Sequence, residues 1–214
     1  MRGSLVVGAF IATLGIGTAA QAGPTMRFGL TFAAEDQSSD GEHSFGPILA
    51  AGYKAGPLTA EIEWAYLSYM SLGDPGPQGM QRLGLTLRGD IWRTDNGRCL
   101  FKSGCTRSRA MYLEAGAAER FGEWGVGGNN TELQTTSYRQ REFHAGVGFE
   151  MDNHTHPTRW GWQVGLRFAV APTVTDEMLG TSCRSTGDTG CPTADKKGTD
   201  ASVMLEWAFL FAKG

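Results

Sequence analysis

The sequence lacks several features that define common classes of protein. Only five of its 214 residues are lysine, and a slight excess of acidic over basic residues with no basic patch argues against nucleic-acid binding. After residue 22, no run of 18 apolar residues occurs, so nothing there predicts a transmembrane helix. No stretch has a helical period strong enough to predict a helix. Glycine, with 31 residues, and aromatic side chains, at 10%, are the abundant components.

Residues 1–22 have the features of a secretory signal peptide. Arg2 precedes an apolar run from Leu5 to Ile16, and Ala20-Gln21-Ala22 has the small-x-small pattern found before a cleavage site. An uncleaved anchor helix is the alternative, which the short, glycine-containing run disfavours. The remaining residues, 23–214, have a length that suits one domain.

The chain has four cysteines, and export would place them in an oxidising compartment. Four cysteines allow three pairings. Proximity in the sequence favours the disulfides Cys99–Cys105 and Cys183–Cys191, each of which closes a small loop. Their spacing is unlike the paired C-x-x-C of a structural zinc site, so no metal is expected there.

Apolar and polar side chains alternate strictly in the last strand-like segment. Val203, Leu205, Trp207, Phe209 and Phe211 recur at every second position, over a length that would cross a bilayer as a tilted strand. Seven earlier segments repeat this unit, so the sequence predicts an all-β, eight-stranded antiparallel up-and-down transmembrane β-barrel, closed by pairing of the last strand with residues 25–34. The predicted strands are 25–35, 45–55, 58–66, 82–92, 111–120, 142–151, 160–170 and 201–211.

The predicted connections differ at the two ends of the barrel. Long polar loops at 36–43, 71–79, 122–137 and 172–200 alternate with turns at 56–57, 93–109 and 152–157, of which 93–109 is long for a turn. Outer-membrane barrels have short periplasmic turns and longer outer loops. Both mature termini are therefore expected on the periplasmic side.

The two faces of the predicted strands suit a lumen and a lipid surface. The mixed face is rich in small residues and in charges of both signs without lysine, as expected where ions must pair in a narrow interior. A soluble lipocalin-like barrel would bury the other face, but exposing such apolar rows to water would exceed tolerable patch sizes. The predicted lumen network is Arg27, Glu61, Glu63, Arg82, Arg88, Asp90, Glu114, Arg120, Glu142, His144, Glu150, Arg167 and Glu206, and the predicted lipid-facing aromatics are Trp64, Trp92, Trp160, Trp162, Trp207, Phe209 and Phe211.

In architecture, residues 25–211 resemble the small eight-stranded outer-membrane proteins of Gram-negative bacteria, in the style of OmpX and the OmpA barrel domain. The final strand carries the most specific part, because family members usually end in an aromatic residue that the assembly machinery reads. Phe209-x-Phe211 fits this pattern, although Ala212, Lys213 and Gly214 follow it. The resemblance implies the outer membrane of a Gram-negative bacterium, with its lipid and assembly machinery as partners.

Several polar residues are candidates for chemistry. His144 lacks the serine that a resemblance to lipid A deacylases would require two residues later, since Gly146 stands there. His43, Ser44 and Asp74, from loops, would correspond to the residues of lipid A palmitoyltransferases, but the amphipathic helix expected before that barrel is absent. The remaining candidates are a weak metal site at Asp152, His154 and His156, and Trp124 as an aromatic contact or girdle residue.

The expected function is therefore non-catalytic. A monomeric barrel with a lumen closed by its own charges would display four outer loops, serving structure, adhesion or recognition of an extracellular ligand, without a cofactor. The alternatives are a narrow pore or small-solute conduit, a lipid A-modifying enzyme, and a secreted lipocalin-like carrier.

Overall fold

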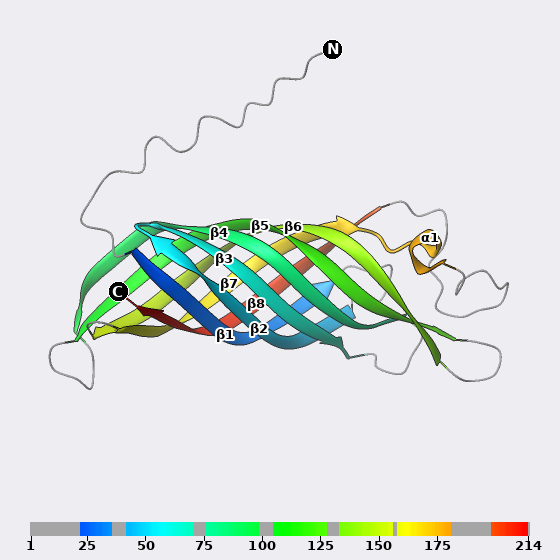
Figure 1. Ribbon diagram of the computed structural model, residues 1–214, viewed down its shortest axis with the longest axis horizontal. Coiled ribbons are helices and arrows are strands. Elements are labelled where there is room, and N and C mark those ends of the chain that lie inside the picture. Colours follow the sequence, from blue (N-terminus) through cyan, green and yellow to red (C-terminus); the bar gives the residue numbers. More distant parts are fainter. Residues whose placement is uncertain are drawn as a thin grey trace, which may run out of the picture.

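The computed structural model describes residues 22–35, 42–70, 76–98, 105–127, 133–155, 158–180 and 198–213, and these form one closed barrel (Figure 1). Each strand pairs antiparallel with the next, and β1 pairs with β8 from Thr25–Ala212 to Glu35–Ser202. The predicted eight-stranded antiparallel up-and-down barrel and its closing strand pair are thereby confirmed. The elements are β1 (Ala22–Glu35), β2 (Glu42–Ala55), β3 (Leu58–Tyr69), β4 (Gly76–Arg98), β5 (Thr106–Gly127), β6 (Leu133–Thr155), β7 (Thr158–Pro172), α1 (Asp176–Leu179) and β8 (Thr199–Lys213).

The alternation in the sequence becomes an inner and an outer wall. Along β8, Ser202, Met204 and Glu206 are buried, whereas Val203 and Leu205 between them are exposed. The same alternation runs through the other strands, because successive side chains of a strand point to opposite faces. The outer wall carries all seven predicted aromatics: Trp92, Trp160, Trp207, Phe209 and Phe211 are exposed, and Trp64 and Trp162 are partly exposed.

Trp64 does not lie at the rim that the sequence suggested for it. It pairs with Leu49 and Leu83 near the middle of the β2–β3–β4 sheet. The alternation predicts a strand that ends near Tyr66, with Trp64 close to the loop, but β3 continues to Tyr69.

Glycines of the inner wall leave room for large side chains that lie across the lumen. A Cβ atom on Gly148 would lie 2.3 Å from the Tyr112 ring, and one on Gly116 would lie 2.5 Å from His144 Nε2. Both are shorter than any ordinary carbon contact, so a side chain at either position would displace the ring. The abundance of glycine on the mixed face is thus explained by close approach.

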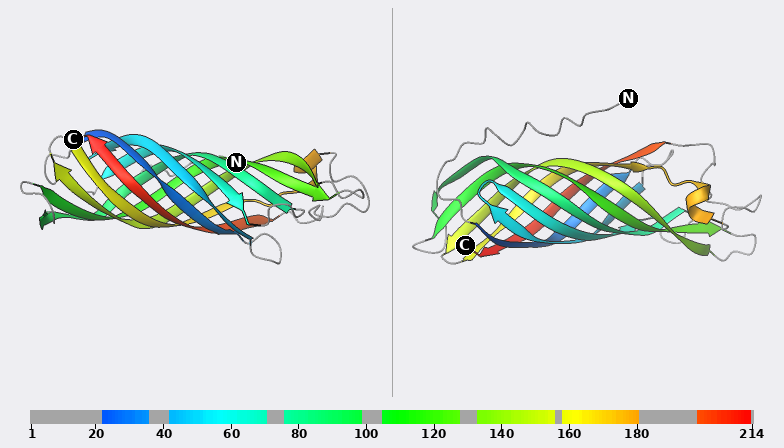
Figure 2. Two further views of the ribbon diagram at one scale, coloured as in Figure 1. Left: turned by 90° about the horizontal axis from the view of Figure 1, so that it is seen from below. Right: turned by 45° about the horizontal axis from the view of Figure 1, so that its top comes forward.

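Strands β5 and β6 are longer than the sequence predicts. The predicted loop at 122–137 is wrong, since β5 continues to Gly127 and β6 begins at Leu133. The resulting hairpin extends beyond the other strands at the end of the barrel opposite the two strand termini Ala22 and Lys213 (Figures 1 and 2). We name this the loop end, and the other the termini end.

The polarity of the alternation inverts in this extension, which is why the sequence did not reveal it. Trp124, Val126 and Tyr138 face inward and are buried, whereas Thr135 and Ser137 face outward. In the body of the barrel the apolar residues face outward instead. A search for strands whose apolar residues face outward therefore finds no strand beyond the point where the polarity inverts.

At the termini end, strands also run further than predicted. The connection at 93–109 is shortened, because β4 reaches Arg98 and β5 starts at Thr106. His154 and Asp152 belong to β6 rather than to a free turn.

Between β7 and β8, residues 176–179 form the single turn of helix α1, which the sequence did not predict. Within the described part of the chain, no helix is long and apolar enough to span a membrane.

Candidate functional site: the charged lumen and its two mouths

Glu63 lies at the centre of the lumen and is shared by three arginines. Its carboxylate accepts hydrogen bonds from Arg27, Arg82 and Arg167, and the Arg167 Nη2 bond to Oε2 is 3.0 Å long. All four side chains are essentially inaccessible to solvent, at 0 or 1% exposure. They project from β1, β3, β4 and β7, so one carboxylate ties four strands together across the barrel.

Three further carboxylates pair with two of these arginines. Arg27 also donates to Glu61 at 3.0 Å and to Glu206 at 3.2 Å, and Arg167 donates to Glu114 at 2.8 Å. Buried ions are tolerated only when partners and hydrogen bonds replace water. Here the guanidinium groups meet carboxylates on neighbouring and opposite strands, which is the arrangement that a dry interior requires.

Arg88 completes the central region toward the termini end. Its Nη1 donates to Gln163 Oε1 at 2.7 Å, and its guanidinium carbon lies 4.2 Å from the centre of the Tyr112 ring. Glu61 lies 3.3 Å from Nη2. Arginine is well suited to this place, because its planar group can stack on a ring and pair with carboxylates at the same time.

A second group of charges, joined to the Glu63 group through Arg82, closes the lumen toward the loop end. Glu142 bridges Arg82, whose Nε lies 2.7 Å away, and Arg120. Arg120 in turn donates to Ser202 at 3.0 Å and lies 3.5 Å from Glu35, whose other oxygen accepts the Tyr69 hydroxyl at 2.9 Å. These contacts link β1, β3, β4, β5, β6 and β8.

A third group lies near the termini end. Asp90 accepts from Lys54 at 2.9 Å and from Arg93 at 3.0 Å, and Arg93 also donates to Glu150 at 3.1 Å. Arg159 donates to Glu150 at 3.2 Å. Cations and carboxylates are again nearly equal in number, so the network is close to neutral along the whole lumen.

The space left near this group is small. A cavity of about 10 Å³ is lined by residues that include Thr25, Glu61, Arg88 and Arg159. That volume accommodates about one water molecule. Several polar atoms at its walls, among them Thr25 Oγ1 and Arg159 Nε, have no hydrogen-bond partner among the described protein atoms, so one water would suit the site.

An apolar cluster lies at the loop end, above the charges. Trp124 and Tyr138 from the β5–β6 extension pack edge to face, with ring centres 6.1 Å apart. Val174 and Leu179, from the segment that contains α1, are buried against them. Trp124 is only 8% exposed. The sequence suggested a surface contact or a girdle residue, and both suggestions are wrong. The inverted alternation turns Trp124 inward under α1.

The structure places all thirteen predicted lumen residues on the inner wall, where each is buried. The sequence missed further members, and the signal that could have found most of them is their phase in the alternation. Lys54 contradicts the expectation of a lumen without lysine. Arg93 was hidden by a β-bulge between Asp90 and Trp92, which turns Trp92 outward and the next residue inward. The missed residues are Glu35, Lys54, Tyr69, Arg93, Ser108, Tyr112, Asp152, Arg159 and Gln163.

Comparison with known proteins relates the chain to one solved fold. No family model matches it, and no curated protein matches it. Among solved structures, the crystal structure of Neisserial surface protein A (NspA) superposes with a TM-score of 0.54 and 14% sequence identity, covering 91% of this chain and 99% of that one. The two proteins share a barrel fold. At this identity the likeness extends to the fold alone.

The candidate His144 is held by hydrogen bonds at both ring nitrogens. His144 Nδ1 lies 2.9 Å from Arg82 and its Nε2 lies 3.1 Å from Thr86 Oγ1, so both ring nitrogens are occupied in a buried place. A general base needs a route to substrate. His43 and Ser44 lie on β2 rather than in a loop, and Asp74 is outside the described residues.

Ser108, Asp152 and His154 come together at the termini end, but not as a catalytic triad. Ser108 Oγ lies 2.9 Å from His154 Nε2, and Asp152 Oδ1 lies 2.8 Å from the same nitrogen. In a triad the carboxylate orients the histidine through its other nitrogen. Arg159 also pairs with Asp152, which argues against a metal ion there. His156, the third residue of the suggested metal site, is outside the described residues.

One of the four cysteines falls within the described residues. Cys105, just before β5, takes part in a disulfide bond. Cys99, Cys183 and Cys191 lie outside the described residues, as does the predicted signal peptide up to residue 21. The pairings Cys99–Cys105 and Cys183–Cys191 stay predictions.

Proposed function

We propose that the protein is a non-catalytic, monomeric barrel of a Gram-negative outer membrane, which displays its loop end at the cell surface and keeps its lumen closed. The observation that carries this proposal is the inverted distribution of polarity. Paired charges fill the interior, while large apolar side chains such as Leu85 and Leu87, 65% and 67% exposed, cover the outer wall. Such a wall in water would form a patch far beyond what soluble proteins tolerate.

The fold supports the same placement. A closed ring of strands leaves no unpaired edge in hydrocarbon, which is the condition for a β-structure to span a membrane. The strand ends Ala22 and Lys213 lie at one end, and we assign this end to the periplasm. Outer-membrane barrels have their longer connections at the surface, and the longest hairpin and α1 are at the opposite end.

The β5–β6 extension is the part that we assign to display. Beyond the apolar wall, its outward side chains become polar or charged, including Glu119, Arg139 and Arg141. Its inward side chains pack on the α1 segment through Trp124 and Leu179. A stiff, water-exposed platform of this kind would hold the adjoining loops in place for contact with an extracellular ligand or another cell.

Membrane fractionation combined with a heat-modifiability gel tests the placement. We expect the protein in the outer-membrane fraction, and we expect unheated samples to migrate faster than boiled ones, because a barrel with a continuous hydrogen-bonded wall resists detergent until heated. Recovery as a soluble periplasmic or secreted protein without detergent would contradict the proposal and favour the lipocalin-like carrier.

Planar-bilayer recording tests the closed lumen. The salt bridges of Glu63 and Glu142 cross the interior, so we expect no steady channels from purified, heat-modifiable protein. Interiors of eight-stranded barrels are just wide enough for their own side chains. Long-lived openings that scale with salt concentration would show that the network moves aside, and the pore alternative would then replace ours. A refolded porin recorded in the same membrane is the positive control.

A further inference from the structure

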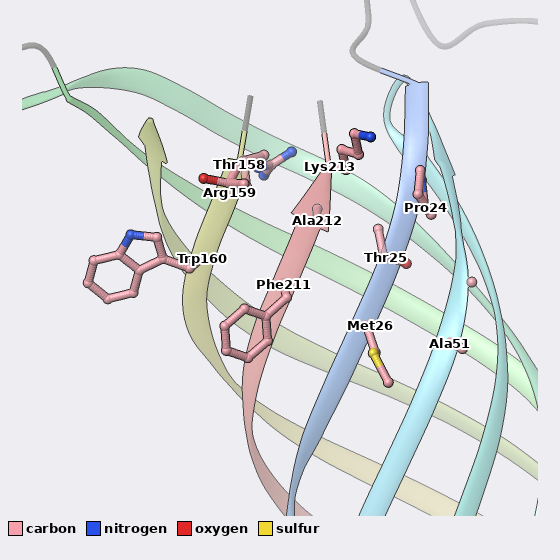
Figure 3. A pocket seen from close by; sticks show the side chains of 11 residues that line it. Pro24, Thr25, Met26, Ala51, Thr158, Arg159, Trp160, Phe211, Ala212 and Lys213 are labelled. Atoms are coloured by element: carbon pink, nitrogen blue, oxygen red, sulfur yellow. The ribbon is translucent and has the colours of Figure 1, made fainter. Parts of the chain in front are cut away.

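The outer wall has an apolar groove at the termini end, shown in Figure 3. Its volume is about 680 Å³, within the range of small-molecule sites. It crosses β7, β8, β1 and β2, so it lies over the seam where the first and last strands close the ring. Its lining includes Pro24, Met26, Ala51, Trp160, Phe211 and Lys213.

The groove results from a contrast in side-chain size. Trp160, Phe211 and Met26 stand out from β7, β8 and β1 in one row, because Phe211 pairs with both of the others (Figure 3). Pro24 and Lys213 lie on the rim side of this row (Figure 3).

Between this row and the rim, Thr25 and Ala212 turn their side chains toward the lumen, so the backbone there is nearly bare on the outer side. Ala51 continues the row on β2 with only a methyl group. In a membrane such a recess faces hydrocarbon, where water has no partners.

One exposed charged side chain marks the rim end of this recess. Lys213, the last residue of β8, is exposed at the rim, beyond Phe211 and Ala212 on the same strand (Figure 3). Among the described residues that line the groove, none carries a carboxylate side chain. Basic residues next to an apolar surface are attracted to anionic lipid headgroups. Apolar length ending at a cation matches a molecule with a hydrocarbon chain and a phosphate.

We propose that this groove binds one acyl chain of a phospholipid from the periplasmic leaflet, with the headgroup phosphate at the Lys213 ammonium. This inference rests on the membrane placement proposed above. The chain would run from Lys213 over the bare backbone at Thr25 to Ala51, with Phe211 and Met26 on one side and Pro24 on the other. The bound lipid would cover the β1–β8 seam. It would exchange more slowly than the lipids of the surrounding bilayer.

Native mass spectrometry can count the retained lipid. Heat-modifiable protein would be extracted in mild detergent and incubated with phosphatidylethanolamine, phosphatidylglycerol or the neutral diacylglycerol. We expect one phospholipid per barrel and weaker retention of diacylglycerol, which lacks the phosphate. An Ala51→Phe variant fills the groove and is expected to lower phospholipid occupancy at least about tenfold, the loss for two or so methylenes that no longer fit.

Matched variants separate the groove from the rest of the wall. Ala60→Phe adds the same ring at an exposed position of β3 outside the groove, and should leave retention unchanged. Lys213→Gln should remove the preference for phospholipid over diacylglycerol, whereas Arg109→Gln, an exposed residue of β5, should preserve it. Equal retention by Ala51→Phe and the native protein, or equal loss in Ala60→Phe, would overturn the groove. A soluble protein that lacks heat-modifiability would instead overturn the membrane placement.

Discussion

Replacing Glu63 by glutamine is expected to lower the free energy of unfolding by about 3–5 kcal/mol, the usual cost of breaking a buried ion pair from one side. The Glu63 carboxylate accepts hydrogen bonds from Arg27, Arg82 and Arg167. These buried arginines cannot reach water when the carboxylate is lost. The glutamine keeps the shape of the side chain, so the loss reports the charge and not a cavity. Urea unfolding in bilayers, followed by tryptophan fluorescence, measures it.

An exposed acid in the same barrel provides the control for Glu63. Glu119 pairs with Arg139 and Arg141 on the outer wall, where water screens the charges. Glu119→Gln should therefore leave the unfolding midpoint unchanged. A Glu63→Gln midpoint indistinguishable from that of Glu119→Gln would mean that water enters the lumen and solvates the arginines, and the closed interior would be wrong.

Replacing Leu85 by arginine is expected to cost about 2–4 kcal/mol in a bilayer, the cost measured for a cation at the midplane of a membrane barrel. Leu85 points outward from the middle of β4, between Ile62 of β3 and Ala117 of β5. In a soluble barrel the same position would be a surface site, where a substitution typically changes stability by less than about 0.5 kcal/mol. The two placements thus predict different outcomes.

A rim position makes the test depend on depth. Thr106 is exposed at the first residue of β5, near the termini end, and Thr106→Arg should cost about 0–1 kcal/mol because the cation reaches the interface. Both variants would be refolded into the same vesicles and compared by urea titration. Equal, small effects at the two positions would show that Leu85 does not face the hydrocarbon of a membrane.

The sequence was sufficient for the barrel body, because its period of two is coupled to a constant polarity. Glu206 and Arg27 fall on the same face as the other inner charges by counting alone, and the structure pairs them at 3.2 Å. Counting fails at Arg93, where the bulge after Asp90 shifts the phase by one residue. A bulge depends on the pairing of two strands, which one strand's sequence does not contain.

The partners within the lumen were also beyond the sequence. Glu63 and Arg167 are 104 residues apart, and they meet only because closure of the ring brings β3 opposite β7. At the loop end, the sequence predicts a loop at 122–137 that includes Trp124, because the inward apolar phase of Trp124 and Tyr138 is opposite to that of the barrel body. Their burial depends on the segment around Leu179, which supplies the other half of the cluster.

The β5–β6 extension leaves one sheet edge without a neighbouring strand. Within the described residues, pairing between β6 and β7 begins at Phe143, so the part of β6 above it has a strand on the β5 side alone. Bare edges invite strand addition from other molecules, and charged side chains are a common protection. Arg139 and Arg141 lie along this edge, while Gln140 and Thr136 bond to Pro172 and Leu179 of the adjoining segment. The exposed hairpin is thereby guarded against edge-to-edge pairing with other strands, even though part of β6 has a neighbouring strand on one side alone.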